Sequence, residues 1–116
     1  MDTTEVVDLI EQQVAAYNAR DLEGFVDCYA ADARILDGSG TVMAEGHDGL
    51  RQMYAPLFES SPDLHAEITN RIHIGTWVID DEHTTGFVLP GYPTELRAVV
   101  AYHVVDGKIA QSQLLG

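Results

Sequence analysis

The sequence contains a single cysteine, Cys28, among its 116 residues. One thiol forms neither an internal disulfide nor a cysteine-based metal cluster, which fits a reducing compartment. Long apolar runs are missing too, since none approaches the roughly 18–20 residues that cross a bilayer. The first residues are acidic and polar, whereas a signal peptide begins basic and then apolar. We therefore expect a cytoplasmic protein.

Positive charge is also scarce. The chain has 6 lysines and arginines against 19 aspartates and glutamates, which gives a net charge of −13. So few cations do not neutralise a row of phosphates, which argues against nucleic-acid binding, and anionic membrane surfaces are disfavoured for the same reason. The remaining composition is ordinary, with 46% hydrophobic and 22% charged residues. It predicts one globular domain over residues 1–116.

Signatures of metals and cofactors are absent as well. Of the five histidines, His65 and His73 share one face of a predicted strand but stand about 26 Å apart at the rise of a strand, too far to share an ion. The sequence has no Gly-x-Ser-x-Gly elbow and no glycine loop of the kind that holds phosphates. We expect neither a metal site nor a cofactor.

The first 60 residues are helical in pattern, with apolar residues at a spacing of three and four. Pro56 lies inside the third apolar stripe and predicts a kink or an early end there. The sequence Gly38-Ser39-Gly40 predicts a turn between two short strands. The predicted elements are helices over 3–19 and 22–29, strands over 33–37 and 41–44, and a helix from 47 or 48 onward.

From residue 64 the pattern changes to a period of two, which indicates strands. The residues Asp80-Asp81-Glu82 predict an interruption, and Asp106-Gly107 is a strong hairpin signal. The predicted strands cover 64–74, 77–79, 84–89, 96–105 and 108–115. Helices followed by strands favour an α+β fold with the helices on one face of an antiparallel sheet.

Three segments carry a resemblance to a known family. They are Val14 to Phe25 (VAAYNARDLEGF), Tyr29 to Ala33 (YAADA) and Asp106 to Ile109 (DGKI), together with Gly46 at the start of a helix. The chain resembles the nuclear transport factor 2-like superfamily, and within it the ketosteroid isomerase and SnoaL-like polyketide cyclase branch. The resemblance implies a cystatin-like cone, in which a curved sheet and three N-terminal helices enclose a pocket. It also implies a homodimer through the outer face of the sheet.

Asp37 is the first candidate for catalysis. Ala33, Ile35 and Asp37 alternate along one strand, so an inward Ile35 predicts an inward carboxylate. An apolar pocket raises the pKa of a carboxyl group toward values useful for proton abstraction. The resemblance to ketosteroid isomerase places the general base at this position. The alternative is that Asp37 only begins the turn at Gly38.

At most one of the two oxyanion donors of that enzyme has a counterpart here that can donate. The resemblance aligns its tyrosine with Gln13 and its protonated aspartate with Val100. Gln13 lies in the apolar stripe of the first helix and can offer an amide donor, whereas Val100 has none. Each missing donor costs about 3–4 kcal/mol of barrier.

Other residues are predicted to contact a ligand. Tyr17 and Tyr54 lie on apolar helix faces, and Tyr102 shares a strand face with Val100, so each hydroxyl can orient a ligand or belong to the core. Trp77 is expected either to line the pocket or to cover the dimer face. The residues that could form a polar dimer face are His73, His103, Arg71 and Arg97.

Three functions remain open. The first is cofactor-free proton transfer on a small apolar substrate, of the isomerase or cyclase type, with Asp37 as base. The second is noncatalytic binding of a small hydrophobic molecule. The third is a dimeric scaffold. The loss of a donor at Val100 favours the second and third.

Overall fold

A computed structural model describes residues 3–115 of the chain. Two helices come first, β1 and β2 precede the third helix, and the other four strands follow it, so helices and strands are largely segregated along the chain as in α+β folds. The elements are α1 (Thr3–Ala19), α2 (Leu22–Asp27), β1 (Tyr29–Leu36), β2 (Val42–Glu45), α3 (Gly46–Ser60), β3 (His65–Ile74), β4 (Trp77–Thr85), β5 (Leu96–Val105) and β6 (Lys108–Leu114). The predicted α+β class is confirmed. Within residues 3–115, no helix is both long and apolar enough to cross a bilayer.

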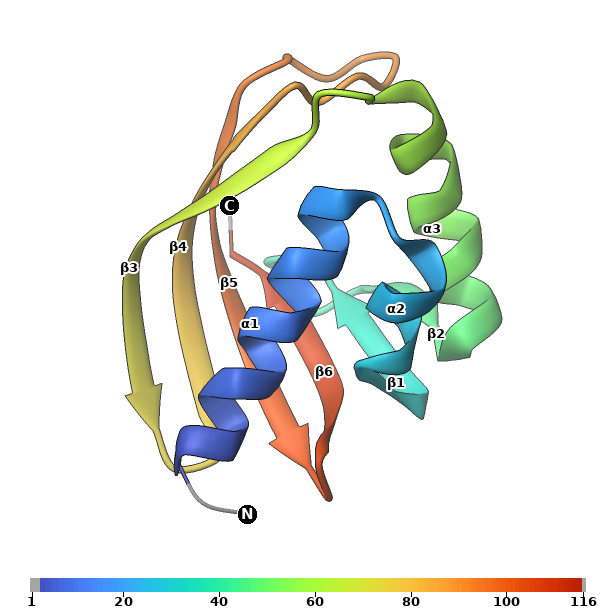
Figure 1. Cartoon of the computed structure of the whole chain (residues 1–116). Helices are drawn as coiled ribbons and strands as arrows, with labels where there is room; N and C mark the ends of the chain where they lie inside the picture. Colours follow the sequence, from blue (N-terminus) through green and yellow to red (C-terminus); the bar gives the residue numbers. More distant parts are fainter. Residues whose placement is uncertain (1–2, 116) are drawn as a thin grey trace.

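The six strands form one sheet in the order β2-β1-β6-β5-β4-β3. The sheet is mixed: β1 and β6 run parallel, and the other neighbouring strands run antiparallel. Register shifts interrupt four of the five pairings, and such bulges bend and twist strands. The sheet accordingly curves around α1 and α2, and α3 lies at its β1–β2 side (Figure 1).

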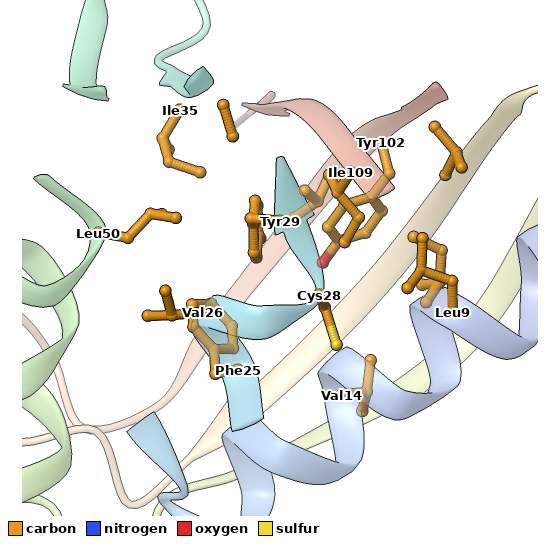
Figure 2. Close-up of a cluster of buried hydrophobic side chains, with 14 of the residues drawn as sticks. Leu9, Val14, Phe25, Val26, Cys28, Tyr29, Ile35, Leu50, Tyr102 and Ile109 are labelled. Carbon is orange, nitrogen blue, oxygen red and sulfur yellow. The ribbon is translucent and has the colours of Figure 1, made fainter. Parts of the chain in front are cut away.

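The hydrophobic core lies between the helices and the concave face of the sheet. Figure 2 shows buried side chains from α1, α2 and α3 directed toward side chains of the strands. Phe25 of α2 is fully buried and its ring lies 5.2 Å from that of Tyr29 in β1. Burying a side chain of this size stabilises the fold by about 1.5–3 kcal/mol. The helices are therefore held firmly enough to position the residues they present to the interior.

The predicted interruption at residues 80–82 is wrong, because β4 continues through it. Val78, Asp80 and Thr84 are buried, so the strand keeps its period of two through the acidic residues. Asp80 is tolerated inside because Arg71 of β3 neutralises it, with Nε–Oδ1 and Nη2–Oδ2 distances of 2.6 and 2.9 Å. The predicted strand over 84–89 is wrong beyond Thr85, where an irregular loop begins.

A bulge in β3 overturns the expected faces of its second half. Ile68 pairs with Glu82 but Asn70 pairs with Asp81, so the alternation of side chains shifts by one residue. Arg71, expected on a polar dimer face, instead points inward to Asp80. Ile72 and Ile74 turn outward, with 50% and 71% of their surface exposed.

Two helix ends also differ from expectation. The second helix ends at Asp27, and Tyr29 begins β1 rather than completing a helical turn. Helix α3 continues for four residues past Pro56, so the early end does not occur. Pro56 is exposed, where the backbone acceptor that loses its partner can be hydrated.

Candidate functional site

A cavity of about 810 Å³ lies between α1, α3 and the concave face of the sheet. We call it the central cavity. Strand β5 gives every second residue of its first part to the wall, and most of the remaining wall is apolar. These β5 residues are Leu96, Ala98, Val100 and Tyr102. The volume falls within the range of small-molecule sites, and an open cavity of this kind is what the ligand-binding hypotheses require.

Glu82 of β4 places a carboxyl group in this apolar wall. Burial raises the pKa of Glu82 to about 7, and the nearby Asp80 charge raises it further, while a hydrogen bond from Tyr102 and the charge of Arg71 oppose the rise. The Tyr102 hydroxyl donates to Glu82 Oε2 over 2.8 Å. Near neutral pH this carboxyl group is present in both protonation states, so it can accept and return a proton.

Arg71 belongs to an ion network behind Glu82. Its guanidinium binds Asp80 on β4 and Glu11 on α1, so it joins the helix to two strands. Asp80 is fully buried, whereas 57% of the Glu11 side chain surface is exposed. Arg71 forms ion pairs with both of these acids, and among the described residues no cation forms an ion pair with the Glu82 carboxyl group.

All five tyrosines of the chain line the central cavity. Burial raises the pKa of Tyr17, Tyr54 and Tyr102 above the usual value of a phenol, so their hydroxyls stay protonated and act as donors. Tyr17 and Tyr54 come from α1 and α3, and their rings form a T-shaped pair with centroids 6.4 Å apart. Both line the same cavity as Glu82, whose charge adds to the rise of their pKa values.

Gln13 lies one helical turn before Tyr17 and also lines the cavity. It is 5% exposed, and its Oε1 has no hydrogen-bond partner among the described residues. A buried amide oxygen without a partner costs about 1–3 kcal/mol. Such a group is the expected mark of a site that a ligand completes. The expectation that Gln13 faces the interior agrees with this geometry, and its role stays a prediction.

The structure corrects the expected orientation of Asp37. Its Oδ1 accepts hydrogen bonds from the Ser39 backbone at 2.9 Å, the Ser39 hydroxyl at 2.6 Å and the Thr41 backbone at 3.0 Å. These bonds lower its pKa, opposite to the expected rise. Asp37 is not among the cavity residues. Strand β1 ends at Leu36, so its alternation does not extend to Asp37, whose side chain is held by the backbone of the turn.

Trp77 is a second correction, because it does not line the cavity. It stacks on His103 of β5 with ring centroids 4.3 Å apart and an interplanar angle of 8°, and it is 39% exposed. Both rings lie on the face of the sheet away from the helices. By contrast, Val100 and Tyr102 lie along the cavity wall, as expected.

The sequence reasoning missed Glu82 and Asp80 because three consecutive acids suggest a turn. A signal was present: Val78, Ile79, Thr84 and Thr85 flank them, and β-branched residues on both sides favour one continuous strand. Alternation within that strand puts Glu82 on the same face as Val78 and Thr84.

Comparisons with known proteins agree with this architecture. The sequence profile of the SnoaL-like domain matches residues 10–112. A cystatin fold protein from Novosphingobium aromaticivorans is 30% identical, with a TM-score of 0.86 over 96% of this chain and 97% of that chain. A search of curated proteins gives no match.

Two more distant structures share the fold. A putative ketosteroid isomerase from Kribbella flavida is 20% identical, with a TM-score of 0.77 over 97% of this chain and 78% of that chain. A putative polyketide cyclase from Sinorhizobium meliloti is 16% identical, with a TM-score of 0.78 over 98% of this chain and 99% of that chain.

Proposed function

Because this chain belongs to the SnoaL-like domain family, we propose that its central cavity binds a small, largely apolar molecule and that Glu82 exchanges a proton with it. The reaction would need no cofactor and would be of the isomerase or cyclase type. The neighbours in fold described as a putative ketosteroid isomerase and a putative polyketide cyclase are consistent with this class.

The observation that carries the proposal is the carboxyl group of Glu82 in an apolar wall. Its pKa of about 7 matches a base that works near neutral pH. The hydrogen bond from Tyr102 fixes one carboxyl oxygen and leaves Oε1 to meet the substrate. Positioned proton transfer of this kind contributes about 10²–10⁴-fold in rate.

The hydroxyls of Tyr17 and Tyr54 are the proposed donors to an oxygen of the bound molecule. They replace the donors that the family resemblance placed at residues 13 and 100, because Tyr17 follows Gln13 by one turn on the same helix face. Ionised Glu82 accepts a proton from the bound molecule, and protonated Glu82 returns it at a second position. The tyrosines stabilise the negative charge that develops between the two steps.

A chromogenic carbon acid tests this proposal without knowledge of the natural substrate. We choose 5-nitrobenzisoxazole, a flat uncharged molecule whose ring opens when a base removes its C–H proton. The expected rate rises with pH through an inflection near 7 and falls at least tenfold in Glu82→Gln. Glu45→Gln is the matched control, because Glu45 lines the cavity but is paired to Arg34 and exposed. A rate equal in wild type and Glu82→Gln contradicts the proposal.

Noncatalytic binding is the second candidate, and Val100 favours it. This residue is buried in the cavity wall and offers no hydrogen bond. Under this alternative Glu82 only anchors a polar group of the ligand. The two candidates differ in the assay above, since a binder with no base activity gives the same rate with and without the Glu82 carboxyl group.

We also propose that two copies pair through the outer face, the sheet surface that carries Ile72, Ile74, Trp77 and His103. Three of these are large apolar side chains with 39% to 71% exposure. Wild type is expected to sediment as a dimer and Ile74→Lys as a monomer. Val88→Lys, at an exposed apolar residue in the loop after β4, should stay dimeric. A monomeric wild type at high protein concentration contradicts the pairing.

A further inference from the structure

The charged side chains that line the central cavity are all acidic, whatever reaction takes place there. Its wall contains two acids, Glu45 and Glu82, and not one of the six lysines and arginines or the five histidines of the chain. The protein as a whole carries a net charge of −13. An anion entering this cavity meets repulsion from these acids and no compensating cation in the wall, so carboxylate and phosphate ligands are disfavoured.

The cations of the chain are held elsewhere. Arg34, Arg51 and Arg97 form ion pairs with acids on the surface. Arg71 is committed to Asp80 and Glu11. Arg20 and Lys108 donate to backbone carbonyl oxygens. The charge of Arg71 still lowers the pKa of Glu82, but among the described residues no lysine or arginine forms an ion pair with it.

The aromatic rings of the wall, in contrast, favour a positively charged ligand. All five tyrosines and Phe87 line the cavity, and the face of an aromatic ring attracts a cation. Gln13 adds a second polar group, 5% exposed and without a partner for its Oε1 among the described residues. Rings, a carboxylate and an unpaired amide acceptor together form the kind of site that binds an organic ammonium ion.

We propose that the natural ligand carries a positive charge, as an amine or quaternary ammonium group on an apolar body, and that this charge lies beside Glu82 among the tyrosine rings. The inference rests on the proposed function, because it uses the same cavity and carboxylate. It deepens that function in one respect. A cation beside Glu82 favours the ionised carboxylate, so the base reaches its proton-accepting form when the ligand is in place.

A pair of probes of the same shape isolates the charge. Phenyltrimethylammonium carries a permanent positive charge, and tert-butylbenzene is its uncharged carbon isostere. Their dissociation constants are measured by NMR titration of the protein at pH 6 and pH 8. We expect the cation to bind at least tenfold more tightly than the isostere at pH 8. The preference should fall several-fold at pH 6, where Glu82 is largely protonated.

The phenols and the arginine near Glu82 keep their protonation states between pH 6 and pH 8, so they do not contribute to this pH dependence. The charged and titratable side chains around it are Asp80 on its own strand, Arg71 on β3 and the phenols of Tyr17, Tyr29, Tyr54 and Tyr102 from α1, β1, α3 and β5. Burial keeps these phenols protonated, and Arg71 stays charged because Asp80 and Glu11 raise its pKa.

Glu82→Gln should remove both the preference for the cation and its pH dependence, whereas Glu67→Gln, at an exposed residue of β3 outside the cavity wall, should keep both. Equal binding of the two probes to wild type, or a preference that survives in Glu82→Gln, overturns the inference. In that case the binding of tert-butylbenzene and turnover of 5-nitrobenzisoxazole still support the proposed function. If neither probe gives saturable shifts of cavity residues, the inference fails. The proposed function fails separately if wild type and Glu82→Gln turn over 5-nitrobenzisoxazole at the same rate.

Discussion

The Tyr102 hydroxyl donates a 2.8 Å hydrogen bond to Oε2 of Glu82 at the wall of the central cavity. The two residues lie on adjacent strands, and Tyr102 is 3% exposed. The bond holds a carboxyl group at a fixed point of a mostly apolar wall. It also lowers the pKa of Glu82 against the larger effect of burial.

Tyr102→Phe should therefore raise the pKa of Glu82 above the value of about 7 that it has with the bond. The ionised carboxylate loses a donor, so the protonated form is favoured. The pKa is read from the ¹³C shift of the Glu82 carboxyl carbon. Tyr54→Phe is the control, since Tyr54 donates no such bond, and it should change the value little. A lower pKa in Tyr102→Phe contradicts this account of the pair.

The same carboxyl group makes stability depend on pH. Because its pKa is raised in the folded state, its favourable contribution is complete below pH 4.5 and is lost as pH rises through about 7. The full loss is up to about 3 kcal/mol. Glu82→Gln does not titrate, so it should gain stability relative to wild type between pH 5.5 and pH 8.

Urea unfolding of both proteins at the two pH values measures this difference. Glu45→Gln is the comparison, and its stability should run nearly parallel to that of wild type. Parallel profiles for wild type and Glu82→Gln would show that the carboxyl group is solvated rather than buried in the wall.

The buried pair of Arg71 and Asp80 should be among the most sensitive points of the fold. Arg71→Met leaves the fully buried Asp80 without its cation, which costs about 3–5 kcal/mol in comparable cases. Arg97→Met breaks an exposed pair with Asp81 on the outer face, where little or no change is expected. Equal losses in the two variants, measured by urea unfolding, would contradict the difference in burial.

Asp37→Ala tests the correction of the first catalytic candidate. It removes the acceptor of three hydrogen bonds in the β1–β2 turn, so a small loss of stability is expected. The rate with 5-nitrobenzisoxazole and its pH profile should stay as in wild type. Asp32→Ala, at an exposed aspartate within β1, serves as control. A large loss of rate confined to Asp37→Ala would return the catalytic role to that residue.

Much of the architecture is predictable from the sequence, because its signals are local. Helical spacing in α1 and α3 and the Asp106-Gly107 hairpin are properties of neighbouring residues. Helical spacing predicts the inward positions of Gln13, Tyr17 and Tyr54. Strand alternation predicts those of Val100 and Tyr102, and all five line the cavity.

The predictions fail where a bulge, a turn or a residue distant in sequence determines which way a side chain points. Donors in the β1–β2 turn hold the Asp37 carboxylate away from the cavity, and a register shift after Ile68 turns Arg71 inward. Local sequence does not predict that shift. Asp80 is stable inside β4 only because Arg71 reaches it from the next strand, so three acids that resemble a turn become the polar part of the site.

The most direct test of the whole account is the titration of the Glu82 carboxyl group by ¹³C NMR in the wild-type protein without added ligand. The account predicts a midpoint near pH 7. A midpoint near 4.5, the ordinary value of a glutamate, would mean that water surrounds this carboxyl group and would contradict both its role as a base and its proposed pairing with a cationic ligand.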